Sequence, residues 1–568
     1  MDLTKINNLP ELFFCQYKEQ KDRNKILLSS LREFGKNYSW EQTFETINNL
    51  SSELKKYVNK GDRCLLISEN RPEWFISDLS IMLADSITVP AYTTYAERDY
   101  EYIISDCTPS VIFVSNTEQF NKIKNIIKSK DFVKKVFSFE KLEEKNKDEY
   151  TNINDLNLNS NILNNFETKI TRKDPSCIIY TSGTQGNPKG VILSHGGILN
   201  NCEGAIEIIK PLITNDQTRF LTWLPLSHSY EHTVQFVQIT VAARIFYAES
   251  IEKLIKNMND CSPEIMTAVP RFYQNLYQKI NASFNKATGL KKILIKKMLN
   301  LGLKKIQKEP LNFIEKIQDS ILDKIVRKKI KAQFGGSLKT FVSGGGALDK
   351  KVGFFLNAIG LPTLQGYGLT ETSPVVSCNP IHKIKVETVG PPFKGNQVKI
   401  AEDGEILVKG ENVMLGYWNK KEETKKVIID GWLHTGDIGE INPEDGYLKI
   451  TDRKKDIIVS AGGDNISPAK IENMITNELE INQCMVYGDK KNYLVALIVP
   501  NKDFFEKKEK INNIIEKINK KLTLVEKIKK IQLINENFSI ENGLLTPTMK
   551  VKRKKVTEKY KNKLEKLY

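Results

Sequence analysis

A loop rich in glycine and hydroxyl side chains connects two short apolar runs. Its sequence, YTSGTQGNPKG, covers residues 180–190, and the flanking runs 177–180 and 191–193 are typical of β-strands. Glycines let backbone N–H groups turn inward around phosphate oxygens, while the hydroxyls and one lysine add donors and positive charge. The loop therefore predicts a polyphosphate site built from Thr181, Ser182, Gly183, Thr184, Gly186 and Lys189.

Two other interpretations of this loop compete with a phosphate site. The P-loop of NTPases requires Ser or Thr directly after its lysine, whereas Gly190 follows Lys189 here. This difference excludes a P-loop. A plain surface turn remains the alternative, because Gly, Ser, Thr and Pro often cluster in loops without function.

The length and composition indicate a multidomain protein inside the cell. With 568 residues, 40% of them hydrophobic, the chain is too long for a single core. The N-terminus lacks the pattern of a signal peptide, and no run of about 18 apolar residues occurs. The eight cysteines form no CxxC pair, so we expect reduced core residues. We therefore expect a cytoplasmic protein.

Positive charge is concentrated in two segments of the chain. The net charge is +16; residues 291–331 contain 13 Lys or Arg against 4 Asp or Glu, and residues 549–568 contain 9 against 2. The rest of the chain is balanced, which argues against nucleic acid as a partner.

Apolar residues recur at helical spacing among the lysines of residues 291–331, which predicts one or two amphipathic helices. Such helices could form a solvated, lysine-rich face. Alternatively, they could lie on anionic lipid, where each nearby lysine adds about 1 kcal/mol to binding. The second alternative would place the protein peripherally on the inner face of a membrane.

Alternating strand and helix patterns predict an α/β fold with a mostly parallel sheet covered by helices. Residues 140–172 have few apolar anchors and are expected to form a loose surface excursion. A helix is expected at 72–83, and strands are expected at 64–68, 87–91, 111–114, 220–224, 244–247, 265–269, 340–343 and 362–364.

Ligands of open α/β sheets bind beyond the carboxyl ends of the strands. Three loops follow predicted strands, namely Pro270-Arg271, SGGGALD at 343–349 and QGYGLTETSP at 365–374. We therefore expect these loops to contribute to one site.

The chain changes character after Gly390, where β hairpins are expected, with turns at 402–404 and 444–446. We place a boundary within TDRKKD, at 451–456. The predicted organisation is a large N-terminal domain over 1–452, a hinge over 453–455 and a small, mobile α+β C-terminal domain over 456–568. The small domain would contain strands at 485–487 and 494–499 and helices at 469–476 and 507–521.

Five segments occur in a fixed order: YTSGTQGNPKG, QGYGLTET, GWLHTGDIG (431–439), TDRKKDIIVSAGG (451–463) and LTPTMK (545–550). This series resembles the AMP-forming acyl-CoA synthetases of the adenylate-forming superfamily, which includes luciferases and peptide-synthetase adenylation domains. The resemblance covers essentially the whole chain. Within that family, PLSHSYEH, DGWLHTGDIG and LTPTMKVKR are most similar to long-chain fatty-acid enzymes.

The resemblance implies an enzyme that uses ATP, Mg²⁺ and coenzyme A. A fatty acid would react with ATP to give acyl-AMP and pyrophosphate, and the CoA thiol would then give acyl-CoA and AMP. The alternative is an enzyme that stops at acyl-AMP or passes the acyl group to the phosphopantetheine of a carrier protein. Because two anions meet in the first step, neutralising charge at the phosphates is the central requirement.

The resemblance also implies roles for residues around the nucleotide. Thr181 and Glu371 would hold Mg²⁺, and Asp437 would accept hydrogen bonds from the ribose. Glycine permits close approach of the backbone to adenine, and a tyrosine ring can stack on it. These further ATP contacts would come from Gly344, Gly345, Gly346, Gln365, Gly366, Tyr367, Gly368 and Thr370.

Other implied roles belong to the second half of the chain. Arg453 and Lys455 lie where the family has a ribose contact and the hinge, and Gly462 and Gly463 would line a tunnel for CoA. An ordinary surface ion pair between Arg453 and Asp437 remains the alternative to the ribose role.

Lys550 aligns with the catalytic lysine of the family, which reaches the carboxylate and the α-phosphate from the small domain. In most members a glycine precedes this lysine, whereas Met549 precedes it here. Lys552 therefore remains a second candidate.

His228 begins the sequence HSYEH, which matches the HxxEH pattern of inverted zinc proteases. The resemblance implies instead that His228 forms a wall of the acyl pocket near the reacting carboxylate, with Trp223 as a gate. A buried structural histidine is the second alternative and a zinc site the third.

Overall fold

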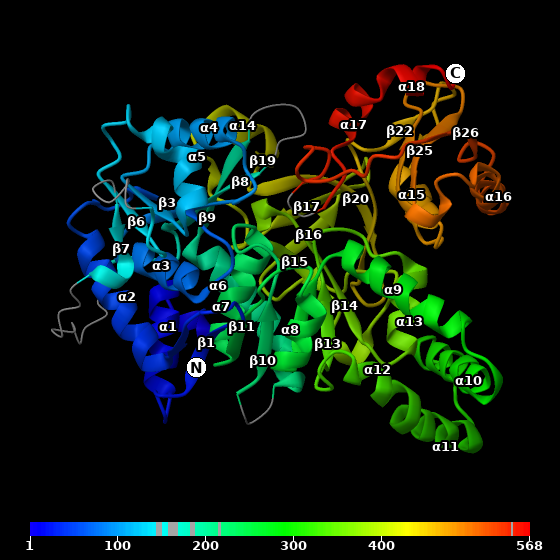
Figure 1. Cartoon of the computed structure of the whole chain (residues 1–568), viewed down its shortest axis with the longest axis horizontal. Coiled ribbons are helices and arrows are strands. Elements are labelled where there is room, and N and C mark those ends of the chain that lie inside the picture. Colours follow the sequence, from blue (N-terminus) through cyan, green and yellow to red (C-terminus); the bar gives the residue numbers. More distant parts are fainter. Residues whose placement is uncertain (144–149, 157–167, 182–187, 214–216, 547–548) are drawn as a thin grey trace.

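The computed structural model describes residues 1–143, 150–156, 168–181, 188–213, 217–546 and 549–568. Within these residues the larger part of the chain contains two eight-stranded sheets and one five-stranded sheet. The C-terminal part, orange and red in Figure 1, lies at one end of the molecule. The predicted α/β class is confirmed.

The sheet that carries the glycine-rich loop has the strand order β18-β9-β8-β4-β3-β5-β6-β7, and its strands from β8 to β7 run parallel. Helix α3 (Pro72–Leu83) packs on one face, and α4 (Glu97–Cys107) and α5 (Thr117–Ile127) pack on the other. Strands covered on both faces read as continuous apolar runs. The strands are β3 (Arg63–Ile67), β4 (Ile87–Ala91), β5 (Val111–Val114), β6 (Lys135–Ser138), β7 (Thr151–Asn152), β8 (Pro175–Thr181), β9 (Lys189–Ser194) and β18 (Gly416–Tyr417).

The second large sheet has the order β15-β14-β13-β12-β10-β11-β1-β2, and only its edge strands β15 and β2 are antiparallel to their neighbours. One buried cluster joins α1, α2, α3, α6 and α7 to strands of both large sheets. The strands are β1 (Ile26–Ser30), β2 (Asn37–Ser39), β10 (Arg219–Thr222), β11 (Arg244–Tyr247), β12 (Ile265–Ala268), β13 (Thr340–Ser343), β14 (Thr363–Gly368) and β15 (Val375–Cys378). The helices are α1 (Leu9–Glu19), α2 (Trp40–Leu54), α6 (His195–Ile209), α7 (Ser229–Thr240), α8 (Leu254–Cys261), α9 (Pro270–Asn285), α10 (Gly289–Ile306), α11 (Phe313–Leu322), α12 (Lys328–Ala332) and α13 (Lys350–Ala358).

Antiparallel strands follow, as the turn signals predict. Gly404 and Gly446 adopt positive φ angles of 83° and 71° in the turns before β17 and β21. The elements are β16 (Gln397–Ile400), β17 (Glu405–Lys409), α14 (Lys421–Val427), β19 (Ile428–Ile429), β20 (Trp432–Ile441) and β21 (Leu448–Arg453).

The C-terminal part combines helices with a three-stranded sheet in the order β24-β25-β26, so its predicted α+β character is confirmed. Its own buried clusters do not include residues of the large sheets. Its elements are β22 (Ile458–Val459), β23 (Asn465–Ile466), α15 (Pro468–Thr476), β24 (Ile481–Tyr487), β25 (Leu494–Pro500), α16 (Lys508–Asn519), β26 (Ile528–Leu533), α17 (Arg553–Lys559) and α18 (Lys561–Glu565).

Two local expectations were wrong. Strand β14 continues to Gly368, so four of the ten residues in the loop expected at 365–374 are strand, because residues 366–368 pair with β15. The excursion at 140–172 is not loose throughout, since β7 adds to the sheet edge and Ile153 is buried. Part of that excursion lies outside the described residues.

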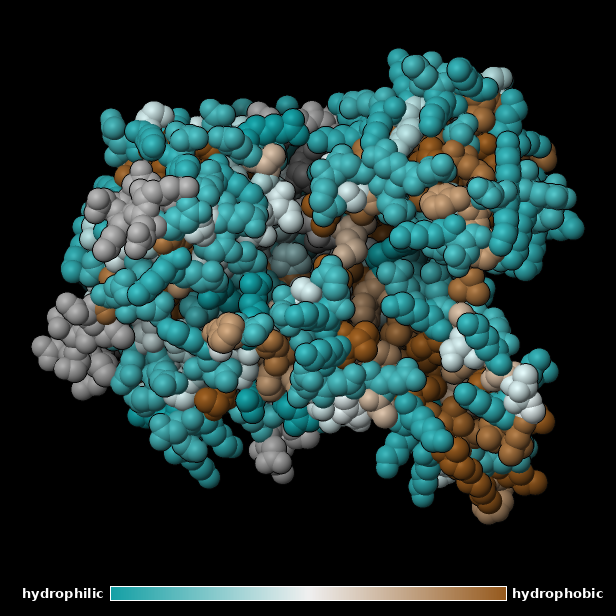
Figure 2. Space-filling model, in the orientation of Figure 1, coloured by the Kyte–Doolittle hydropathy of each residue, from teal (hydrophilic) through white to brown (hydrophobic). Residues whose placement is uncertain are grey.

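The surface is mostly hydrophilic on the face shown in Figure 2, and apolar side chains gather over α10 and α11. Among the described residues, no helix is both long enough and apolar enough to cross a bilayer. All eight cysteines are unpaired, and all except Cys15 are buried.

Gly302 holds α10 against α13. A Cβ at this position would lie 2.3 Å from the carbonyl oxygen of Ala358, a backbone atom that cannot rotate away. The close approach of the two helices therefore requires glycine.

We predict that Gly302→Ala destabilises the protein by about 1 to 3 kcal/mol, because α10 must shift, even though alanine favours helices. Thermal unfolding would show a midpoint lowered by several degrees. Asn300→Ala, at an exposed position of the same helix, is the control and should not lower the midpoint. An unchanged midpoint for Gly302→Ala would contradict the close packing.

Candidate active site

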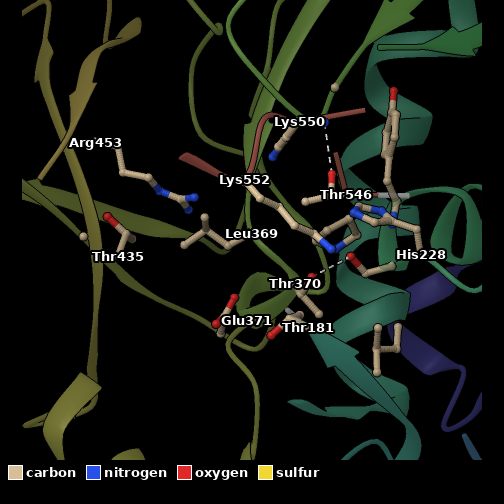
Figure 3. Close-up of a pocket in the computed structure, with 18 of the residues that line it drawn as sticks. Thr181, His228, Leu369, Thr370, Glu371, Thr435, Arg453, Thr546, Lys550 and Lys552 are labelled. Carbon is tan, nitrogen blue, oxygen red and sulfur yellow. Dashed lines mark hydrogen bonds between the residues drawn. The ribbon is translucent and has the colours of Figure 1, made fainter. Parts of the chain in front are cut away.

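A cavity of about 1870 Å³ lies between the large N-terminal part and the C-terminal part of the chain. Strand ends and loops of the large sheets line one side, and residues 485–489 and 550–555 line the other. In Figure 3, side chains from both parts project into this space, among them Glu371, Arg453 and Lys550. The shape of the cavity therefore depends on the position of the C-terminal part, which forms one of its sides.

Both ends of the predicted phosphate loop reach the cavity. Thr181 and Lys189 pair across the β8–β9 ladder, and both line the cavity. The Lys189 ammonium pairs with Glu423 and lies 4.8 Å from the centre of the Tyr417 ring. Outside the described residues lie Ser182, Gly183, Thr184 and Gly186.

Glu371 and Thr181 both line the cavity, and both are labelled in Figure 3. The Tyr417 hydroxyl donates to Glu371 Oε1 at 2.9 Å. One carboxylate and one hydroxyl suit Mg²⁺, which prefers oxygen ligands and completes its shell with water and phosphate. The described residues contain no cluster of three or more His, Cys, Asp and Glu side chains that could hold a metal. A magnesium ion here would take its remaining ligands from water or from substrate phosphate.

Tyr367, Asp437 and Arg453 form one hydrogen-bonded group. The Tyr367 hydroxyl donates to Asp437 Oδ2 at 2.8 Å, and Arg453 Nε donates to Oδ1 at 3.0 Å. The ladder of β20 and β21 sets this geometry because it pairs Asp437 with Arg453. Asp437 is only 6% exposed, whereas Arg453 is exposed, so the pair joins a buried carboxylate to a guanidinium that faces solvent. Burial beside this carboxylate raises the pKa of Tyr367 well above its usual value, which keeps its hydroxyl a donor.

Gly344 requires the absence of a side chain, since a Cβ would lie 2.7 Å from the Tyr230 ring. The Tyr230 hydroxyl in turn donates to the Val342 carbonyl at 3.1 Å, which fixes the ring. The predicted nucleotide contacts that line the cavity are Gly344, Gly345, Gly366, Tyr367, Gly368, Thr370, Arg453 and Lys455.

Five predicted or expected contacts do not line the cavity. One is Asp437, although its partners Tyr367 and Arg453 both line it. Gly346 is exposed, and Gln365 is buried with its amide donating to the Val386 carbonyl. Pro270 and Arg271 do not line the cavity, although we expected their loop at the site, because Arg271 donates instead to Asn482 of the C-terminal part.

Lys550 enters the cavity from the C-terminal part. Removal from bulk water and the positive charge of Arg453 lower the pKa of Lys550 to about 8, although Asp437 and Asp456 act in the opposite direction. The side chain stays open to the solvent of the cavity. Lys552 lines the same cavity, and burial together with Lys555 lowers its pKa as well. Both lysines thus remain candidates on position alone.

His228 is the N-cap of α7, where its Nδ1 accepts from the Tyr230 N–H at 3.1 Å. This bond leaves Nε2 as the protonated nitrogen, free to donate. Burial lowers the pKa of His228 to about 4, and the positive charge of Lys550 adds to the effect. The ring is therefore neutral at physiological pH and lies close to Lys550.

The three residues of HSYEH that match the fixed positions of HxxEH do not share a partner. His232 Nε2 lies 2.8 Å from Asp78 Oδ2. Burial disfavours the charged form of His232, but the negative charge of Asp78 has the larger effect and raises the pKa of His232 to about 10. Glu231 accepts from the Thr267 hydroxyl at 2.7 Å. Since His228 faces the cavity instead, the three side chains do not converge, and the zinc alternative is disfavoured.

An apolar branch of the cavity was not predicted from the sequence. We call it the apolar chamber; its walls come from α6, α7, β10, β12, β13 and β15 and from the segment after β15. Trp223 does not line the cavity. Its indole N–H donates to the carbonyl of Thr267, and Thr267 lines the cavity in its place. The residues of the chamber are Ala205, Ile208, Ile209, Phe220, Val234, Val237, Ile265, Val342, Val375 and Phe393.

Gly462 and Gly463 lie outside the cavity. They form an exposed turn between β22 and β23, and Gly463 has a positive φ of 87°. Their predicted place beside CoA therefore depends on a different position of the C-terminal part.

Comparisons with known proteins agree with this geometry. The family described as AMP-binding enzyme matches residues 15–418, and the AMP-binding enzyme C-terminal domain matches residues 455–568. The chain belongs to the AMP-binding enzyme family.

Similar proteins cover almost the whole chain. A long-chain-fatty-acid–CoA ligase of Mycobacterium bovis is 30% identical over 90% of this chain and 88% of its own length. Long-chain-fatty-acid–CoA ligase 5 of Mus musculus is 31% identical over 93% of this chain and 84% of its own.

Solved structures share the fold at low identity. An anthranilate CoA ligase in complex with anthranoyl-AMP has a TM-score of 0.77 and 19% identity, covering 98% of this chain and 99% of its own. The O-succinylbenzoate coenzyme A synthetase of Bacillus subtilis, in complex with AMP, has a TM-score of 0.71 and 19% identity, covering 97% and 98%.

We predict that Lys550 titrates near pH 8. Competitive acetylation between pH 6 and pH 10, read by mass spectrometry, should show its reactivity reaching half of its maximum near that pH. Lys454 is the control, because ion pairs with Asp403 and Glu405 raise its pKa above the ordinary value. If Lys550 titrates together with Lys454, the cavity and the charge of Arg453 do not lower the pKa of Lys550 as described above.

Proposed function

We propose that the protein is a long-chain fatty acid–CoA ligase. It would convert ATP and a fatty acid into acyl-AMP and pyrophosphate, and then acyl-AMP and CoA into acyl-CoA and AMP. The observation that carries the proposal is the entry of Lys550 into a cavity that also contains Glu371, Thr181 and an apolar chamber. The long-chain ligases that match most of this chain support the choice of substrate.

In the first step, the residues around the cavity would bind and orient ATP. Thr181, Lys189 and the intervening loop would surround the β- and γ-phosphates, while Tyr367 and Asp437 would hold the nucleoside. Glu371 and Thr181 would hold Mg²⁺, which when bound neutralises phosphate charge. We infer that Tyr417 positions Glu371, since its hydroxyl donates to that carboxylate.

Lys550 would stabilise the transition state for attack of the carboxylate on the α-phosphate. A lysine at about 4 Å from developing negative charge, at an effective dielectric near 20, contributes about 4 kcal/mol. Its pKa of about 8 leaves it mostly protonated at neutral pH, and anionic substrates would favour the charged form further. His228, neutral and with Nε2–H free to donate, would orient the carboxylate without adding charge.

The apolar chamber would hold the acyl chain. It borders His228 and Tyr230 within one continuous cavity, so a carboxylate near His228 would leave the chain directed into the chamber. An aliphatic chain gains about 0.8 kcal/mol for each CH₂ buried. The residues of the apolar chamber would thus contact the acyl chain, and Trp223, which the sequence suggested as a gate, would not.

The second step would need a rotation of the C-terminal part about residues 453–455. Lys550 would leave the cavity, and the exposed turn with Gly462 and Gly463 could then approach the site and admit the pantetheine of CoA. Residues 456–568 would act as the mobile lid. We place the activity in the cytoplasm, where ATP and CoA are available.

The first test uses the adenylation half-reaction. With palmitate, ATP and Mg²⁺, the protein should exchange labelled pyrophosphate into ATP. Lys550→Ala should slow this exchange by about two to three orders of magnitude, on the order of 3 to 4 kcal/mol, and should spare thioester formation from preformed acyl-AMP.

Lys552→Ala is the matched control and should retain most of the exchange activity. If Lys552→Ala is the more damaging change, the two lysines have exchanged roles. If no acid supports exchange, the ligase proposal fails. AMP release that is independent of CoA but increases with a phosphopantetheinylated carrier protein would favour the alternative acceptor.

The second test concerns chain length. Val237→Phe should shorten the apolar chamber and shift the ratio of kcat/KM for C16 over C8 acids by about tenfold towards C8. Val241→Phe is the control, because Val241 lies at the end of the same helix but does not line the cavity. An unchanged C16 to C8 ratio in Val237→Phe would show that the chain lies elsewhere.

A further inference from the structure

Helix α11 exposes its apolar side to solvent. Ile314, Ile317, Ile321 and Ile325 recur every three or four residues, which places them on one face of α11 and the turn that follows it. Their exposed fractions are 64%, 47%, 49% and 47%, and Phe313 beside them is 78% exposed. We call these five residues the outer stripe.

The orientation of α11 is fixed by its charged side, which faces the protein. Lys304 Nζ lies 2.6 Å from Glu315 Oε1, and Lys305 Nζ lies 2.7 Å from Asp319 Oδ2. Arg327, almost completely buried, lies 2.7 Å from the other oxygen of Asp319. A surface helix usually buries its apolar side, but here only Leu322 of α11 is buried in the core, and together with these ion pairs it holds the isoleucines outward. Its exposed apolar side is therefore not a result of loose packing.

The apolar surface extends beyond α11. Leu290 and Ile293 at the start of α10 are 70% and 63% exposed. Figure 2 shows apolar side chains gathered over α10 and α11, next to hydrophilic ones. Contiguous apolar patches of this kind mark interaction sites on soluble proteins.

The positive charge around the outer stripe favours an anionic lipid surface over a second copy of the protein as the partner. Residues 291–331 carry 13 Lys or Arg against 4 Asp or Glu, and the exposed Lys324 and Lys328 each lie within one helical turn of Ile325. In a symmetric dimer through this patch, the same positive charges would face each other. A surface that combines apolar side chains with lysines instead matches a layer of anionic lipid headgroups over acyl chains.

We propose that α10 and α11 dock the protein on anionic lipid membranes, with the outer stripe inserted at the headgroup boundary and the lysines facing the lipid phosphates. This docking does not require catalysis. The strand β12, whose Ile265 and Thr267 line the cavity, leads directly through α9 into these two helices. A docked protein would thus hold the site near the phase in which long-chain acids accumulate.

Vesicle co-sedimentation of the full-length chain tests the proposal. The protein should bind vesicles of phosphatidylglycerol and phosphatidylcholine, bind pure phosphatidylcholine much less, and lose part of the binding at high salt. The double variant Ile317→Gln/Ile321→Gln keeps the charge and should bind about tenfold more weakly. Lys324→Gln/Lys328→Gln should also weaken binding and reduce its dependence on salt.

The matched control is Ile255→Gln/Ile429→Gln, which makes the same chemical change at two exposed isoleucines on other elements. It should bind vesicles like the unchanged protein, and all variants should keep their thermal midpoint and their pyrophosphate exchange with a short, soluble acid. If the unchanged protein and all variants lacked pyrophosphate exchange, this result would contradict the ligase proposal but not the docking proposal.

Two results would overturn the docking proposal. One is vesicle binding that is equal in the stripe variant and its control. The other is a dimer, seen by light scattering, that forms in the unchanged protein and is lost in the stripe variant without any binding to vesicles.

Discussion

The carboxylate of Asp437 connects the parts of the molecule on which the site depends. It accepts from Tyr367 at the end of β14 and from Arg453 at the end of β21, and so joins a large sheet to the strand from which the C-terminal part departs. Arg453 in turn contributes to the lowered pKa of Lys550. The charge state of the lysine therefore depends on a contact between segments that are distant in sequence.

The fold could be predicted well because its strands are buried on both faces. Such strands appear as unbroken apolar runs between polar loops, and those at 87–91, 111–114, 244–247 and 340–343 have the predicted bounds. The polar part of the site was also accessible, since glycine-rich loops after strands carry their chemistry in local sequence. Thr181, Glu371 and Lys550 accordingly lie in one cavity.

Features that depend on tertiary packing could not be predicted. The apolar chamber is formed by residues from six separate elements that look like ordinary core residues in sequence, and Tyr417 meets Glu371 across 46 residues without any spacing rule. The spacing of isoleucines in α11 correctly predicted a helix but not its orientation. That orientation is set by ion pairs with α10 and with Arg327, whose partners only the fold identifies.

The contacts of Tyr230 bear on how the enzyme would select acids by chain length. Its ring contacts Gly344 on the nucleotide side, and its hydroxyl is bonded to Val342, a wall residue of the apolar chamber. A rigid partition of this kind would give every acid the same starting point, whatever its length. Selectivity for chain length would then depend only on residues near the far end of the acyl chain. Variants of those residues could change the range of accepted acids without changing the rate of the chemical steps.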